Sequence, residues 1–261
     1  MGTVDFSEDV FDHLQKRIFK ATYCGKDCYV KLLGGSKRNR FHRLQKMIFG
    51  VTRIPLLAPT LVVSEENGIV HEAEKLGELK RLGLNVPAVY SYSQRYLILE
   101  DCGRSLPEII REKSGQTQAY LEMAIRELGK LHRNGQCHGG AQIRNFTLKN
   151  DEIYLIDFEE EIQAEYFEGI FFRDIVLFLT SIIGCGIFSF SLPDLITAYE
   201  QSSQIKIWER LVNLANRGRL LELITKKPFV KWCGKDLLAV NRIFEQIRLL
   251  GGSPNPCQHA N

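Results

Sequence analysis

Hydrophobic and polar residues alternate along short segments in the first hundred positions, which is the pattern of half-buried β-strands. Residues 18–33 predict two strands joined by a turn, and residues 87–93 and 95–100 predict two more. Between these pairs, residues 71–83 carry apolar side chains at near-helical spacing and end in Gly83, a typical residue after the last turn of a helix. The first part of the chain is therefore predicted to be β-rich with one helix.

In the second part of the chain the apolar positions follow the period of amphipathic helices. Residues 117–135 place Leu and Ile on one face and close with a glycine, and residues 171–250 continue the helical pattern. Residues 145–158 are the exception, because they predict a hairpin whose turn is Asn150–Asp151. The expected organisation is an α+β, bilobal chain with a β-rich N-terminal lobe over residues 1–100, a larger mainly helical lobe over residues 101–250 and a flexible tail over residues 251–261.

Composition and charge are those of an ordinary globular protein. Of the 261 residues, 44% are apolar and 25% are charged, and the net charge of +3 gives no reason to expect nucleic acid as a partner. The seven cysteines are odd in number and form no Cys-x-x-Cys pair. Scattered cysteines of this kind indicate reduced thiols and a cytoplasmic protein.

One long uncharged segment, residues 175–192, approaches the shortest length that can span a bilayer. Its serines and glycines reduce its hydrophobicity, and the charged pair Arg173–Asp174 lies immediately before it. A buried helix of a globular lobe is therefore predicted instead of a membrane span.

Candidate chemistry begins with Asp157, which ends an apolar strand and is followed by three glutamates at positions 159–161. A carboxylate at the end of a buried strand needs a cation, a metal or backbone donors. An acidic cluster of this kind suits Mg²⁺, which prefers hard oxygen ligands and bridges to phosphates. The segment is equally compatible with a solvated acidic turn, and both interpretations stay open at this point.

Two further features extend the metal interpretation. Asn145 lies twelve residues before Asp157 and has an amide oxygen that could serve as a second ligand. Lys31 stands alone in the apolar run around Val30 and therefore needs an anionic partner, for which Glu72 on the following helix is a candidate.

Taken in order, these residues form a set of the protein-kinase type. It comprises a strand Lys, a helix Glu, a connecting segment LILEDCG, the loop HGGAQIRNF from His138 and the strand end LIDF. The chain resembles the atypical kinase-like superfamily, and most of all the bacterial lipopolysaccharide core and Kdo kinases and their small relatives near the RIO and Bud32 kinases. The resemblance covers about residues 15–200.

The resemblance implies a role for each residue of the set. Lys31 would contact the α and β phosphates of ATP while Glu72 holds it, and Asp174 would brace the loop at His138 from the helix beneath. Asp157 would act in catalysis together with Lys31. Asn145 and Asp157 would bind Mg²⁺, and the adenine would meet the backbone around Glu100, Asp101 and Cys102.

Three departures from the kinase pattern are visible in the sequence. The catalytic carboxylate expected two residues after His138 is Gly140. The glycine expected after Asp157-Phe158 is Glu159, which we interpret as a candidate replacement base or additional metal ligand. Only one glycine, Gly25, lies between the first two strands, where phosphate-binding loops have two or three.

Three hypotheses about function follow. The first is ATP- and Mg²⁺-dependent phosphoryl transfer to a hydroxyl, with the sugar of an envelope glycolipid as the acceptor that the resemblance suggests. The second is a catalytically impaired pseudokinase that serves as a binding or regulatory module, and the third is transfer of AMP. Arg144 stands before Asn145 where the third hypothesis would favour an acid. The basic stretch Lys37–Lys46 indicates either a solvated loop or a surface that meets an acidic substrate or the inner face of a membrane.

Overall fold

The computed structural model describes residues 17–33, 65–160, 167–218 and 235–251 of the chain. These residues form two compact units. The sheet unit contains the chain up to Arg104 together with Thr147–Ile170, and the helical unit contains Ser105–Phe146 and the chain from Phe171 onward. The predicted basic surface at Lys37–Lys46 and the predicted tail beyond Gly251 lie outside the described residues.

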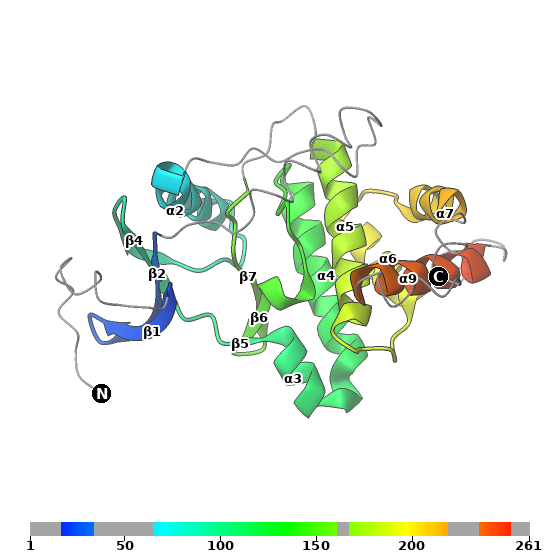
Figure 1. Ribbon diagram of the computed structural model, residues 1–261, viewed down its shortest axis with the longest axis horizontal. Coiled ribbons are helices and arrows are strands. Elements are labelled where there is room, and N and C mark those ends of the chain that lie inside the picture. Colours follow the sequence, from blue (N-terminus) through cyan, green and yellow to red (C-terminus); the bar gives the residue numbers. More distant parts are fainter. Residues whose placement is uncertain (1–16, 34–64, 161–166, 219–234, 252–261) are drawn as a thin grey trace. The chain divides into compact units, whose positions relative to one another are not determined.

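The sheet unit is built on a four-stranded antiparallel sheet in the order β1-β2-β4-β3 (Figure 1). Cys24 and Gly25 make the turn between the first two strands, both with positive φ angles of 48° and 76°. This two-residue turn is the conformation that matches the twist of paired strands. The strands are β1 (Ile18–Tyr23), β2 (Lys26–Leu32), β3 (Val89–Tyr92) and β4 (Tyr96–Glu100).

Alternation along the strands gives this sheet two different apolar faces. One face gathers Cys28, Val30 and Ile98 with several partly buried aromatic rings. On the other face Leu97 packs against Ile69 and Ala73 of helix α2 (Glu65–Arg81). Lys31 lies directly opposite Leu97 in the register of β2 and β4. The strand period therefore points Lys31 to the face that α2 covers.

A second sheet, in the order β5-β6-β7, carries the predicted hairpin. Asn150 and Asp151 form its turn with φ angles of 51° and 60°. The three strands are β5 (Arg104–Ser105), β6 (Phe146–Lys149) and β7 (Glu152–Leu155).

The hairpin groups with the sheet unit, whereas the sequence assigned residues 101–250 as a whole to the helical lobe. The N–H of Leu155 donates to the carbonyl oxygen of Asn85 at 2.9 Å. Gly103 approaches Leu148 so closely that a Cβ atom at position 103 would lie 2.2 Å from the Leu148 carbonyl oxygen. These contacts are long-range in sequence, which is why local periodicity does not reveal them.

The helical unit is organised around α4 (Thr117–Arg133), which is amphipathic and buries Leu121, Leu128 and Leu131. Gly129 allows α4 to approach α6 (Leu192–Ser203), because a Cβ atom there would lie 1.9 Å from Ser202 Oγ. In the described ranges, the helices of this unit are α3 (Leu106–Glu112), α4, α5 (Phe167–Gly184, in this unit from Phe171), α6, α7 (Trp208–Arg217) and α9 (Lys235–Gly251). Short 3-10 turns lie at Ser114–Gln116 and Ile143–Asn145.

The uncharged segment 175–192 begins inside α5 and continues beyond it, since the helix ends at Gly184 and α6 begins at Leu192. Ile175, Phe178, Leu179 and Ile182 are fully buried. In the described ranges, helices that combine the length and hydrophobicity of a bilayer span are absent.

The predicted fold class is confirmed. A β-rich N-terminal part with one helix precedes a larger, mainly helical part, as expected of an α+β chain (Figure 1). The four predicted strands before residue 100, the hairpin and the helices at 71–83 and 117–135 all exist with ends shifted by a few residues.

Replacing Gly103 with Ala is expected to lower the free energy of unfolding by about 3 kcal/mol. The new methyl group would overlap the Leu148 carbonyl, and the φ angle of 86° is unfavourable for alanine. Urea unfolding measures the loss. Gly83→Ala is the matched control, because Gly83 also has a positive φ but has open space around it, so only about 1 kcal/mol should be lost. Equal losses in the two variants would contradict the close approach of Gly103 to Leu148.

Candidate functional site

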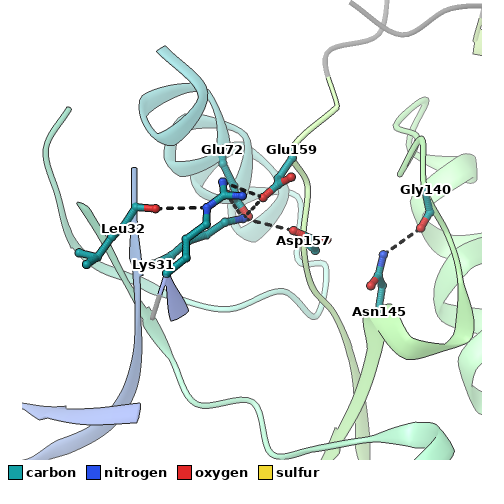
Figure 2. A network of polar contacts seen from close by, with 8 residues as sticks. Lys31, Leu32, Glu72, Gly140, Asn145, Asp157 and Glu159 are labelled. Carbon is teal, nitrogen blue, oxygen red and sulfur yellow. Dashed lines mark hydrogen bonds and ion pairs between the residues drawn. The ribbon is translucent and has the colours of Figure 1, made fainter. Parts of the chain in front are cut away.

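The centre of the candidate site is the ammonium group of Lys31, which three carboxylates surround (Figure 2). Nζ lies 2.6 Å from Glu72 Oε2, 2.6 Å from Glu159 Oε1 and 3.2 Å from Asp157 Oδ1. An ammonium has three N–H donors, so these three partners match its full donor capacity. The structure thus brings together Lys31, Glu72, Asp157 and Glu159, all of which the sequence singled out.

Different elements deliver the four side chains. Lys31 comes from β2 and Glu72 from α2, one residue before Ala73, which packs on the same face of the sheet. Asp157 and Glu159 follow β7, and Asp157 has a φ angle of 70°. A left-handed conformation costs a residue other than glycine about 1–2 kcal/mol, and such strain is concentrated at functional sites. At Asp157 this left-handed conformation accompanies a carboxylate that points toward Lys31.

Burial and charge oppose each other at this cluster. Burial alone would lower the pKa of Lys31, but the carboxylates of Glu72, Asp157 and Glu159 outweigh it and raise the pKa well above its ordinary value. Burial raises the pKa of Glu72, and the Lys31 ammonium opposes that rise. Lys31 therefore stays charged at neutral pH. Glu72 is 1% exposed and depends on Lys31 for its compensation.

The segment predicted to meet the adenine is held by two ion pairs. Lys149 Nζ donates to Glu100 Oε1 at 2.9 Å and to the carbonyl oxygen of Asp101 at 2.7 Å. Lys20 Nζ donates to Asp101 Oδ2 at 2.9 Å. Burial raises the pKa of Cys102 to about 12, so this thiol is inert at neutral pH. Side-chain contacts thus fix the segment from both sides, and its contact with a base stays a prediction.

In the helical unit, Asp174 of α5 fixes the loop that begins at His138. Its carboxylate accepts the backbone N–H groups of His138 at 2.8 Å, Gly139 at 3.1 Å and Ala141 at 3.4 Å. Arg173 donates to the Gly139 carbonyl oxygen. The loop is therefore held through its main chain.

Gly140 and Asn145 lie in this loop (Figure 2). Asn145 Nδ2 donates to the Gly140 carbonyl oxygen at 2.9 Å, and the Gly140 N–H donates to His138 Nδ1 at 3.3 Å. From His138 to Gln142 the loop has no carboxylate. The Asn145 amide orientation leaves its oxygen directed away from Gly140, but its role as a metal ligand stays a prediction.

Sequence reasoning missed two features of the sites. Arg17 lies just before β1, and its Nη2 is 3.5 Å from Glu159 Oε1. The second feature is the pair of side-chain contacts made by His132 of α4. His132 is 2% exposed, and it hydrogen-bonds Tyr199 Oη at 2.7 Å and Asp174 Oδ2 at 3.4 Å. The separation of these partners along the chain left no local signal for either contact.

The carboxylates around Lys31 suit a metal ion only if a bound substrate supplies the remaining metal ligands. In the part of the chain that the structure describes, groups of three or more His, Cys, Asp or Glu side chains arranged to hold a metal are absent. Asp157 offers hard carboxylate oxygens, and its side chain is 33% exposed. Mg²⁺ is commonly held by one or two carboxylates and completed by substrate phosphates, which this donor set can accommodate.

Replacing Lys31 with Met is expected to lower the free energy of unfolding by about 3–5 kcal/mol, because Glu72 would remain buried without its cation. The double variant Lys31→Met/Glu72→Leu should recover most of the loss. Denaturant unfolding gives both values. Lys26→Met, an exposed lysine on the same strand, should change stability by less than about 0.5 kcal/mol. A similar small change at Lys26 and Lys31 would contradict the importance of the buried pair.

Acidification is expected to destabilise the protein between pH 7 and pH 5. Burial lowers the pKa of His132 below its ordinary value of 6.5, although Asp174 opposes the shift. The unfolded state therefore binds more protons in this range, and stability falls by up to about 1.4 kcal/mol per pH unit for this one group. The lowered pKa of Asp174 adds a similar loss only at more acidic pH.

Denaturant unfolding at pH 7 and pH 5.5 measures this dependence. His132→Gln should flatten it, whereas the control His71→Gln should keep it. If the two variants respond alike to acid, His132 is not the group responsible.

Comparison with known proteins places these features in a family. Residues 18–182 match the model of the RIO domain, which is more than half of the chain. A KEOPS complex subunit Bud32 from Pyrococcus abyssi is 29% identical over 93 residues, covering 34% of this chain and 42% of the relative. A probable bifunctional tRNA threonylcarbamoyladenosine biosynthesis protein from Methanocorpusculum labreanum is 29% identical over 107 residues, covering 41% and 19%.

The chain spans less than half of the length of these curated relatives. Among solved structures, WaaP in complex with acyl carrier protein aligns over 92% of each chain with a TM-score of 0.44 and 13% identity. The match to the RIO domain confirms the predicted membership of the atypical kinase-like superfamily, and it supports a function of the phosphotransferase type. The chain belongs to the RIO domain family.

Proposed function

We propose that the protein is an ATP- and Mg²⁺-dependent phosphotransferase that acts on a hydroxyl group. The observation that carries the proposal is the convergence of two carboxylates from separate segments on one buried ammonium. Oxygen atoms of Glu72 and Asp157 both lie within 3.2 Å of Lys31 Nζ. In a family of the kinase type, a buried lysine ammonium of this kind is suited to bind phosphate.

Each residue has a stated part in the proposal. Lys31 binds the phosphates as a point charge, and Glu72 orients Lys31 from α2. Asp157 holds the metal ion through its partly exposed carboxylate. When bound, Mg²⁺ supplies charge neutralisation on the phosphate oxygens. Two further assignments belong to the proposal. Asn145 is a second metal ligand, and the segment from Glu100 to Cys102 contacts the adenine.

The missing carboxylate at Gly140 lowers the expected rate without removing the chemistry. A positioned base typically contributes about 100- to 10,000-fold. Phosphoryl transfer depends mainly on positioning and on stabilisation of charge, and the proposal assigns both to the residues around Lys31. Glu159 is the acid of this cluster that we propose as a replacement base. A slow phosphotransferase is the expected result.

The acceptor is proposed from its chemical class. A hydroxyl on the sugar of an envelope glycolipid is the first candidate, since the sequence resembles kinases of that kind. This acceptor would place the protein in the cytoplasm, peripheral to the inner membrane. Other hydroxyl-bearing substrates are tested by the same assay.

The competing proposal is a binding or regulatory module without turnover. Gly140 favours it, because the loop from His138 to Gln142 has no carboxylate to accept the proton of an attacking hydroxyl. Both proposals include nucleotide binding at Lys31, so only measurements of turnover separate them.

Asp157→Asn is expected to reduce phosphoryl transfer from ATP by at least about 100-fold while leaving the fold intact, because the amide keeps its shape and loses the charge that holds the metal. Transfer to glycolipid and other hydroxyl acceptors is followed by mass spectrometry. Thermal-shift titrations with ATP, with and without Mg²⁺, follow binding.

Asp151→Asn is the matched control, since Asp151 is an exposed acid in the turn of the same hairpin. Its activity should equal that of the unmodified protein. Full activity in Asp157→Asn would remove the phosphotransferase assignment. A magnesium-dependent thermal shift without transfer to any acceptor would favour the binding module.

A further inference from the structure

One oxygen atom of Glu159 is the meeting point of two cations. Glu159 Oε1 lies 2.6 Å from Lys31 Nζ and 3.5 Å from Arg17 Nη2. The Lys31 side chain is 6% exposed, whereas the Arg17 side chain is 43% exposed. A buried ammonium and a more accessible guanidinium therefore converge on a single anionic position.

The main chain fixes the position of Arg17. Its carbonyl oxygen accepts the N–H of Leu32 at 2.8 Å, and its Nε donates to the Leu32 carbonyl oxygen at 3.3 Å. These contacts extend the pairing of β1 and β2 by one residue beyond Ile18. They anchor the guanidinium beside Lys31, which lies one residue before Leu32. A planar guanidinium with several N–H donors is well suited to phosphate oxygens.

The turn between β1 and β2 is not placed to bind phosphate at Lys31. Phosphate-binding loops offer several backbone N–H groups from a glycine-rich turn. Here Tyr23 pairs directly with Lys26, so the turn contains only Cys24 and Gly25. Ile18 pairs with Lys31, so this turn lies at the opposite end of the hairpin from Lys31, whereas Arg17 lies at the Lys31 end.

We infer that Arg17 and Lys31 together form a phosphate-binding site, here called the Arg17–Lys31 site, and that Glu159 competes with the phosphate for it. Arg17 is then a second cationic phosphate contact beside Lys31. The inference rests on the proposed function for the identity of the ligand as the oligophosphate of a nucleotide and for the retention of Asp157 at the site.

The charges around the site explain why Glu159 must move. Two cations, Arg17 and Lys31, face three carboxylates, Glu72, Asp157 and Glu159, so the local sum is one negative charge. A phosphate adds further negative charge and would be repelled. Removing Glu159 from the sum leaves two positive and two negative charges.

Glu159 is the carboxylate best placed to leave. Glu72 is 1% exposed and fixed on α2, whereas the Glu159 side chain is 24% exposed. The Asp157 side chain is 33% exposed, but it is required for the metal in the proposed function, so the choice of Glu159 over Asp157 rests on that function. Phosphate and Glu159 would thus use the same two donors in turn.

The test measures binding of inorganic tripolyphosphate and of ATP by isothermal titration calorimetry at fixed ionic strength. Arg17→Ala should weaken tripolyphosphate binding by about 10- to 100-fold, the usual effect of losing one charged hydrogen-bond partner. Arg17→Lys should recover only part of the loss, because an ammonium cannot bind two phosphate oxygens in a planar fork. Glu159→Gln should tighten binding by about fivefold or more, because it removes the competing charge but keeps the shape.

Arg81→Ala is the matched control. Arg81 is exposed on α2 in the same unit, and its Nε also donates to a backbone carbonyl, that of Gly77, at 3.3 Å. This variant makes the same change in net charge, and its affinity should stay within about twofold of the original. Far-UV circular dichroism verifies that all four variants are folded.

Each outcome supports or overturns the inference. Equal tripolyphosphate affinity in Arg17→Ala and Arg81→Ala would overturn it, as would unchanged or weaker binding in Glu159→Gln or no binding by the unmodified protein. If tripolyphosphate follows the expected pattern but ATP is neither preferred nor turned over, the Arg17–Lys31 site stands and the proposed function fails. If ATP is turned over and Arg17→Ala has no effect, the function stands and the site fails.

Discussion

The buried ammonium of Lys31 is the constraint on which the sheet unit depends. A charged side chain that is only 6% exposed is tolerable only with close anions, and the three carboxylates that supply them come from α2 and from the segment after β7. This requirement ties strand, helix and hairpin end into one arrangement. It also explains why residues more than a hundred positions apart in the chain belong to one compact unit.

Much of this arrangement could be predicted from the sequence, because it depends on patterns within short segments of the chain. The alternating pattern around Lys31 predicted its strand, and an isolated lysine in an apolar run called for an acidic partner, which Glu72 provides. The spacing from His138 to Asp157 indicated the family before any geometry was known. The turn at Asn150–Asp151 was equally visible, since both residues tolerate positive φ.

The features that could not be predicted depend on contacts between distant residues, which leave no pattern in the neighbouring sequence. Arg17 reaches Glu159 across 142 positions, and His132 reaches Tyr199 across 67. Neither residue stands out by its neighbours in sequence. The grouping of the hairpin with the sheet unit likewise follows from the approach of Gly103 to Leu148. Long-range packing decided these features, whereas periodicity and motif spacing report only on short segments.

The hydrogen bonding of the loop to Asp174 has a consequence for the evolution of such proteins. Because Asp174 binds the backbone amide groups of His138, Gly139 and Ala141, this contact does not depend on the side chain at position 140. An exchange between glycine and a carboxylate at that position would alter reactivity and leave the contacts of Asp174 with these amide groups in place. Loss and recovery of a catalytic acid are therefore separated by a single codon change in this scaffold, and descendants on either side of that change would share the same fold.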